Sequence, residues 1–393
     1  MVYVSKNQST TLQLEDSGRQ DKDDNQAVEV LDALLEKATH QGASDIHIEP
    51  QQDLLRIRQR VEGILVVTHL LPKKLARRLI SRIKVLAHLD ISERRLPQDG
   101  RIKHAAMSEL ADVRVSTLPT LWGEKAVLRL LDHAPTERGL DALGMDRTQR
   151  EQFTRALDQP QGLILVTGPT GSGKTLTLYS GLRHLNNEQS NVITVEDPVE
   201  IRLRGANQIA VNTKLGLGFA QILRALMRQD PDVIMVGEIR DFETATAAIR
   251  AAQTGHLVLS TLHTGSTGST LARLHQMGIK LYDLTSTITL VIAQRLARRL
   301  CDQCKQPDPP HAVYRAKPPG CSECFQSYCG RVGIFELLPF SDRLISALHE
   351  CGSKEGIIVP AEKFIRTSLR DSAMTKVAEG VTSMEEANRL API

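Results

Sequence analysis

The segment GPTGSGKT at residues 168–175 constrains the fold of this chain more than any other feature. It follows the apolar run LILVT at 163–167 and precedes TLTLYSGLRHL, whose composition is compatible with a helix. This order of strand, loop and helix is the context in which G-x-x-x-x-G-K-[ST] forms a phosphate-binding loop, or P-loop. The glycines let successive backbone N–H groups turn toward phosphate oxygens, and the following helix adds the positive end of its dipole. The sequence therefore predicts a nucleotide-binding site in an α/β domain.

The residues of this loop have distinct expected roles. Lys174 is expected to bridge the β- and γ-phosphates and so to act in catalysis, and the Thr175 hydroxyl is expected to bind Mg²⁺. The residues predicted to bind the nucleotide here are Gly168, Pro169, Thr170, Gly171, Ser172, Gly173, Lys174, Thr175 and Leu176.

Two acidic residues follow apolar runs elsewhere in the chain. Glu196 comes directly after VITV at 192–195, and Glu238 follows DVIMVG at 232–237. The carboxyl ends of parallel strands are where open α/β sheets bind ligands. A P-loop site needs one carboxylate near the magnesium ion and another to orient the attacking water. We assign Glu238 to the first role and Glu196 to the second.

The run LVLST at 257–261 is flanked by two histidines, His256 at its start and His263 just after it. A structural role at a strand end fits each of them taken alone. Together they are predicted to bind near the γ-phosphate and to respond to its loss. Neither has the spacing of a metal ligand. These runs lack polar alternation, which is typical of strands buried on both faces of a parallel sheet.

Four cysteines form the pattern C-x₂-C-x₁₆-C-x₂-C, made by Cys301, Cys304, Cys321 and Cys324. Each C-x₂-C turn directs two thiolates at one tetrahedral ion, so the spacing predicts a structural Zn²⁺ site. The alternative is a set of reduced or redox-active thiols, and Cys329 or His311 could replace one ligand. Cys351 is expected to serve packing.

Pattern and composition divide the chain into six parts. A polar tail (1–26) precedes a small N-terminal α/β domain (27–132), in which helices are expected near Ala27–His40 and Lys73–Leu89 and a turn at Glu62-Gly63. A linker (133–150), with a hinge within 133–145, leads to the ATPase core. The remaining parts are the core itself (151–300), the tetracysteine metal-binding module (301–340) and a helical C-terminal region (341–393).

Composition argues against several classes of protein. The net charge is only +3 and aromatic residues make up 3% of the chain, which disfavours direct nucleic-acid binding. No run approaches the roughly 18 apolar residues of a membrane span, and the start lacks the pattern of a secretory signal. A cytoplasmic protein without a transmembrane segment is therefore expected.

Several segments together resemble a known family, the secretion ATPases of type II secretion and type IV pilus assembly. GASDIHIEP at 42–50 and RRLPQDGRI at 94–102 are similar to its N-terminal signatures. GPTGSGKT resembles its Walker A motif, ITVEDPVE its aspartate box, DPDVIMVGEIRD its Walker B motif and TGHLVLSTLHT its histidine box. QRLARRLC with the cysteine pairs resembles its tetracysteine zinc module.

The resemblance implies a fold and a function. The expected fold is a RecA-like P-loop ATPase domain preceded by a small α/β domain, in a homohexamer that binds ATP between the two domains. Arginines of the N-terminal domain reach the phosphates in this family, and their positions here are Arg101, Arg114 and Arg129. The implied function is ATP-driven assembly of pilin or pseudopilin at an inner-membrane platform protein, through which the chain associates peripherally with the membrane.

Three alternatives remain open. The first is a pilus-retraction or DNA-uptake motor, against which the cysteine module argues. The second is a zinc-containing nucleic-acid translocase. The third is an assembly scaffold that does not hydrolyse ATP.

Overall fold

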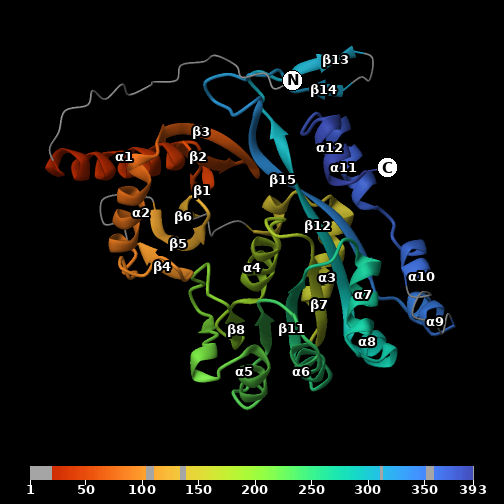
Figure 1. Cartoon of the computed structure of the whole chain (residues 1–393). Helices are drawn as coiled ribbons and strands as arrows, with labels where there is room; N and C mark the ends of the chain where they lie inside the picture. The colour runs from red at the N-terminus through yellow and green to blue at the C-terminus, as the bar shows by residue number, and fades with distance from the viewer. Residues whose placement is uncertain (1–19, 103–109, 133–138, 310–312, 351–357, 393) are drawn as a thin grey trace. The chain divides into compact units, whose positions relative to one another are not determined.

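The computed structural model describes residues 20–102, 110–132, 139–309, 313–350 and 358–392 (Figure 1). The chain forms two compact units, Met1–Asp132 (unit 1) and His133–Ile393 (unit 2). No helix in the described ranges is both long enough and apolar enough to cross a bilayer.

Unit 1 is an antiparallel sheet with two helices on one face. Its six strands lie in the order β3-β2-β1-β6-β5-β4. Their bounds are β1 (Ala43–Pro50), β2 (Leu54–Val61), β3 (Ile64–Pro72), β4 (Gln98–Ile102), β5 (Leu110–Thr120) and β6 (Gly123–Asp132), and the helices are α1 (Gln20–His40) and α2 (Lys74–Leu86).

Alternation in the sequence explains why only one face is covered. In β1, Ile46 and Ile48 are fully buried toward the helices, whereas Asp45 and Glu49 project to the opposite, charged face. The expected turn between β2 and β3 is confirmed, because Glu62 and Gly63 both have positive φ (49° and 80°), as a two-residue hairpin turn requires.

Unit 2 is built on a seven-stranded sheet in the order β15-β12-β7-β11-β10-β8-β9. All neighbours are parallel except β15, which runs antiparallel to β12 at the edge. The strands are β7 (Gly162–Thr167), β8 (Val192–Glu196), β9 (Asn207–Ala210), β10 (Val233–Val236), β11 (Leu257–Leu262), β12 (Ile288–Leu300) and β15 (Tyr328–Pro339). The four strands expected from apolar runs are confirmed and are fully buried.

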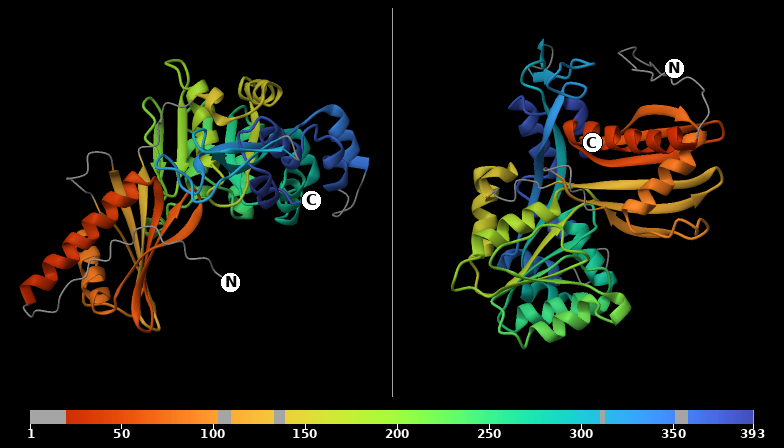
Figure 2. Two further views of the ribbon diagram at one scale, coloured as in Figure 1. Left: turned by 90° about the horizontal axis from the view of Figure 1, so that it is seen from above. Right: turned by 90° about the vertical axis from the view of Figure 1, so that its left-hand side faces the viewer.

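Helices cover both faces of this sheet (Figures 1 and 2). Alternate residues of β7 point to opposite cores: Ile164 packs with α3 (Arg147–Leu157) and α4 (Lys174–Leu185), and Leu165 packs with the helices of the other face. Those helices are α5 (Phe219–Leu226), α6 (Phe242–Gln253), α7 (Thr267–Gln276) and α8 (Leu281–Thr287), with α9 (Asp342–Glu350) beyond them. Short 3₁₀ turns occur at η1 (Leu140–Leu143) and η2 (Thr213–Leu215).

The chain after residue 300 contributes to the sheet as well as to the cysteine module. β15 lies within the range 301–340 and pairs with β12, and the small hairpin β13 (Gln306–Asp308) and β14 (Val313–Arg315) lies between them in sequence. The C-terminal helices expected from the sequence include α10 (Ile358–Lys363), α11 (Leu369–Ala378) and α12 (Met384–Leu390). α11 and α12 pack on β12 and β15.

The first helix is longer than the sequence pattern predicts. Helix α1 begins at Gln20 rather than near Ala27, so the end of the expected polar tail is helical. Residues 1–19 of the tail, 133–138 of the hinge, His311 and Cys351 lie outside the described residues.

Candidate nucleotide site and cysteine cluster

The P-loop joins β7 to α4 as the sequence predicts. Its glycines Gly168, Gly171 and Gly173 have φ of 150°, 77° and 86°, a region in which side chains are strained. At Gly168 a Cβ would lie only 2.5 Å from the Gln294 carbonyl oxygen and 2.5 Å from the Ser172 Oγ. Glycine is therefore required at this position both by backbone conformation and by the close approach of β12.

Lys174 opens α4 and turns its side chain back into the loop. Its Nζ donates to the carbonyl oxygens of Gly168 at 2.8 Å and Pro169 at 3.1 Å, and the residue is only 8% exposed. Burial lowers the pKa of Lys174 to about 8; Glu238 opposes this shift and Arg295 adds to it. The loop thus encloses a cation whose hydrogen bonds, among the residues that the structure describes, go to backbone carbonyls.

The rest of the loop is more open to solvent. Pro169, Thr170 and Gly171 are exposed, and Thr175 and Leu176 are half-buried. Ser172 is buried, and its Oγ has no hydrogen-bond partner among the residues that the structure describes.

Glu238, which follows β10, lies in a charged cluster beside the P-loop. It accepts from Arg240, and one carboxylate oxygen lies 3.6 Å from His263 Nε2. Burial, followed by the charge of Lys174, lowers the pKa of His263 below its usual 6.5, so its ring is mainly neutral at pH 7. Thr175, which is half-buried, follows Lys174 in the chain, and the Glu238 carboxylate acts on the Lys174 charge; both side chains carry oxygen atoms, the kind of ligand that Mg²⁺ prefers.

His256 lies at the other end of the sheet. Leu257 of β11 pairs with Gly162 at the start of β7, whereas the P-loop follows Thr167 at its end. Six residues of strand separate these ends by about 20 Å. The His256 ring instead contacts the carbonyl oxygen of Ala251 at the end of α6, with Nδ1 at 2.8 Å. The structure therefore does not bring His256 to the nucleotide site, and we leave it out of the proposed site.

Glu196 ends β8 and is buried within a set of neutral donors. Its carboxylate accepts from the hydroxyls of Tyr179 (2.8 Å to each oxygen) and Thr194 (2.7 Å), and from Gln208 Nε2 at 3.3 Å. Sequence reasoning missed Tyr179 and Gln208. The sequence marks Tyr179 only as a residue with a polar hydroxyl among the residues of the P-loop helix that are buried.

The three arginines predicted in unit 1 lie on neighbouring strands. Arg101 of β4 is directly opposite Arg114 of β5, which is opposite Arg129 of β6. Arg129 Nε in turn donates to Asp45 Oδ1 at 3.1 Å. Like charges directly opposite one another are unfavourable in a sheet, and the Asp45 carboxylate offsets part of the positive charge of this row.

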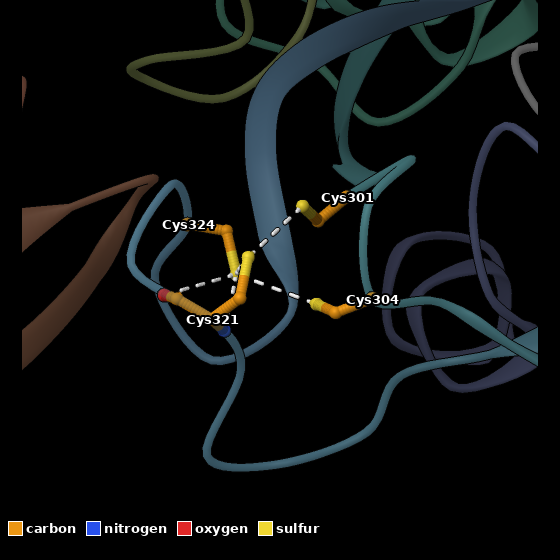
Figure 3. A group of neighbouring side chains, drawn as sticks. All are labelled: Cys301, Cys304, Cys321 and Cys324. Carbon is orange, nitrogen blue, oxygen red and sulfur yellow. Dashed lines mark hydrogen bonds between the residues drawn. The ribbon is translucent and has the colours of Figure 1, made fainter.

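The four predicted cysteines come together, as Figure 3 shows. Their Sγ atoms all lie within 4.8 Å of one another. The Sγ distances are 3.7 Å for Cys301–Cys321, 3.6 Å for Cys304–Cys324 and 3.6 Å for Cys321–Cys324. A tetrahedral zinc site with Zn–S bonds of about 2.3 Å would have sulfur–sulfur distances of about 3.8 Å.

The local structure explains this convergence. Each pair sits on a turn closed by a backbone hydrogen bond, from Cys304 N to Cys301 O at 3.3 Å and from Cys324 N to Cys321 O at 3.4 Å. One turn follows β12 and the other precedes β15, and these strands are paired. The four thiols therefore fit a tetrahedral soft metal ion, and the exposed Cys329 is not part of the cluster.

Comparison with known sequences gives a consistent result. The family described as "Type II/IV secretion system protein" matches residues 20–389. The type IV pilus assembly ATPase PilB of Acinetobacter baylyi is 48% identical over 94% of this chain and 67% of its own length. The type II secretion system ATPase E of Vibrio cholerae is 45% identical over 94% of this chain and 76% of its own. The HofB homolog of Escherichia coli, a protein transport protein, is 47% identical over 92% and 81%.

Solved structures agree on the fold. The structure of the ATPase DotB of Legionella pneumophila matches over 92% of this chain and 95% of its own, with a TM-score of 0.69 at 24% identity. The pilus retraction motor PilT with bound ADP matches over 92% of this chain and 96% of its own, with a TM-score of 0.63 at 25% identity. These matches confirm the predicted α/β P-loop ATPase fold with its preceding α/β domain. The chain is a member of the type II/IV secretion system protein family.

Proposed function

We propose that this chain is an ATP hydrolase that powers assembly of a type IV pilus or a type II secretion pseudopilus. The names of its relatives at 45–48% identity support this function. The observation that carries it is the buried Lys174 ammonium inside the P-loop, beside the strand-end carboxylate Glu238.

Binding would begin at the P-loop. Lys174 would exchange its bonds to the Gly168 and Pro169 carbonyl oxygens for the β- and γ-phosphate oxygens of ATP. Thr175 and Glu238 would hold Mg²⁺, which would neutralise charge on those oxygens. Glycines without side chains keep the loop backbone accessible to the phosphates.

Hydrolysis requires a base and further cations. Glu196 would accept the proton of the water that attacks the γ-phosphorus, and ADP would leave on the opposite side. His263, mainly neutral at pH 7, would contact the γ-phosphate region through its place beside Glu238. By resemblance to the family, Arg101, Arg114 and Arg129 would offset negative charge on the phosphoryl group as it is transferred.

The cysteine cluster has a structural part in this proposal. Cys301, Cys304, Cys321 and Cys324 would hold Zn²⁺ and fix the ends of β12 and β15 to each other. All four ligand positions are supplied by thiolates, so this ion would take no part in hydrolysis.

We further propose that the chain acts as a homohexamer in the cytoplasm, bound to an inner-membrane platform protein. Changes in the angle between its two units during the ATP cycle would do mechanical work on that partner. Assembly is preferred over retraction because the relatives at 45–48% identity are named assembly and secretion ATPases, whereas the retraction motor is 25% identical.

Two substitutions test the catalytic assignment in the full chain. Lys174→Ala should abolish ATP binding, whereas Glu196→Gln should keep binding and lower kcat by about 100-fold or more. Glu200→Gln is the matched control, because it changes an exposed carboxylate four residues away in the same segment.

Phosphate release and nucleotide binding should be measured for each variant. Wild-type turnover in Glu196→Gln would contradict its role as the base. If turnover were lost in Glu200→Gln instead, the role would pass to Glu200.

A further inference from the structure

Tyr179 is a buried residue on the P-loop helix whose hydroxyl faces the Glu196 carboxylate. The residue is 2% exposed, and its hydroxyl oxygen lies 2.8 Å from both carboxylate oxygens of Glu196. The same oxygen lies 2.8 Å from the Ile201 carbonyl and 2.9 Å from Gln208 Nε2.

Counting protons decides which of these hydrogen bonds form. Tyr179 has one O–H, and the Gln208 amide has two N–H groups. Gln208 Nε2 lies 2.8 Å from the Ile201 carbonyl oxygen, 2.9 Å from the Tyr179 oxygen and 3.3 Å from Glu196 Oε1, so its two protons go to the two nearer acceptors and the contact with Glu196 is the weakest of the three. The Tyr179 proton is then free to point at Glu196.

The two oxygens of Glu196 are therefore held unequally. Oε1 accepts from Thr194 Oγ1 at 2.7 Å and shares the Tyr179 proton with Oε2. For Oε2, Tyr179 is the one hydrogen-bond donor among the described residues. Within the described part of the chain, no cation forms an ion pair with Glu196. One oxygen is thus fixed by neutral donors, and the other keeps lone pairs for a further partner.

This arrangement links the carboxylate to the phosphate-binding turn. Tyr179 follows Lys174 by five residues on α4, which is about 7.5 Å along the helix axis. Thr194 lies on β8 with Glu196 and donates to it directly, whereas Gln208 belongs to β9 and holds the Tyr179 oxygen, so the groups that fix the carboxylate come from three elements. A carboxylate held by three rigid elements has little freedom to rotate.

We propose that Tyr179 is a positioning residue for ATP hydrolysis: its hydroxyl orients Glu196 so that Oε2 faces the attacking water. This inference rests on the proposed role of Glu196 as the base. Tyr179 itself would contact neither ATP nor water.

The test removes the hydroxyl and keeps the ring. Tyr179→Phe should lower kcat by about tenfold or more while ATP affinity stays within about twofold of wild type, since the loss acts on the transition state. Tyr328→Phe is the matched control: it deletes another buried hydroxyl, which bonds to Ser383 Oγ at 2.8 Å, and kcat should not change.

A double-mutant cycle separates positioning from a merely structural effect. If Tyr179 acts through Glu196, adding Tyr179→Phe to Glu196→Gln should cause no further loss in single-turnover rate. A full additional loss would overturn the inference. Thr194→Val deletes the other hydroxyl donor with little change of shape and should lower kcat in the same non-additive way. This variant provides the test if Tyr179→Phe fails to fold.

The outcomes also separate this inference from the proposed function. If Glu196→Gln loses turnover while Tyr179→Phe keeps wild-type kcat, only the role of Tyr179 is overturned. If Glu196→Gln keeps wild-type turnover, the assignment of the base itself fails.

Discussion

The buried ammonium of Lys174 gives the nucleotide site a specific pH dependence. Burial lowers its pKa to about 8, well below the usual value of 10.5. A bound triphosphate would stabilise the charged form and raise this pKa again. ATP binding and proton uptake are therefore coupled at this side chain.

We predict that ATP binding takes up about half a proton per site near pH 8, because about half of the free protein then lacks the Lys174 proton. Above pH 8 the dissociation constant should rise by up to about tenfold per pH unit. Isothermal titration calorimetry in buffers of different ionisation enthalpy measures both quantities. Lys174→Arg is the control. Arginine stays charged across this pH range, so if the variant binds ATP, its binding should take up no proton at this position. A dissociation constant that stays flat from pH 7.5 to 9.5 would contradict the prediction.

Some residues of the candidate site could be predicted from the sequence and others could not. The P-loop residues were predictable because their spacing is local and each glycine answers a backbone requirement. The places of Glu238 and Glu196 at strand ends were predictable because apolar runs mark the strands, and the carboxyl ends of parallel strands meet at one edge; their roles stay predictions. Tyr179 and Gln208 were not, because their contact with Glu196 joins parts of the chain 17 and 12 residues away from it, with no motif to mark them. His256 was misplaced even though the sequence puts it at the start of its run, because the amino end of a parallel strand lies at the edge of the sheet opposite the P-loop.

At the scale of elements, the edge of the ATPase sheet was hidden in the sequence. The interiors of β7, β8, β10 and β11 contain apolar residues and an occasional Ser or Thr but no charge, whereas β12 ends in RLARRL, where arginines interrupt the pattern. Its partner β15 starts 28 residues after β12 ends, beyond a segment dominated by cysteines and prolines. Local periodicity therefore indicated an irregular module, and only antiparallel pairing with β12 places β15 in the sheet.

The ends of these two strands carry a prediction about metal. One Zn²⁺ per chain is expected in the protein as purified, and Cys304→Ser should lose it, because three thiolates bind the ion far more weakly than four. The melting temperature should also fall, since the ion would join the turns after β12 and before β15. Cys329→Ser is the matched control, an exposed cysteine outside the cluster, and should keep the metal. Elemental analysis decides: full metal content in Cys304→Ser would contradict the assignment.

At the scale of the whole molecule, the proposed catalytic groups are divided between two compact units. The P-loop, Glu196 and Glu238 belong to unit 2, whereas the row Arg101, Arg114 and Arg129 belongs to unit 1. Each unit has its own sheet and its own core, so the sequence patterns predicted both folds separately. Neither periodicity nor motif spacing shows how the two units cooperate. Only the resemblance to the family suggested that both contribute to one site.

This division yields a prediction that neither unit could satisfy alone. Arg114→Gln should leave nucleotide binding to the P-loop largely intact and lower kcat by about 10³-fold, the range seen when a phosphoryl-transfer enzyme loses a charge-stabilising arginine. Arg56→Gln is the matched control on the same face of the unit 1 sheet, where Arg56 pairs with Glu49 at 3.0 Å and Arg58 and Lys125 remain to satisfy that carboxylate. Its kcat should stay near wild type. Steady-state hydrolysis and ATP binding by the full chain measure both variants. Equal, small effects of Arg114→Gln and Arg56→Gln would contradict the prediction, because Arg114 would then contribute no more to the transition state than an arginine paired with Glu49.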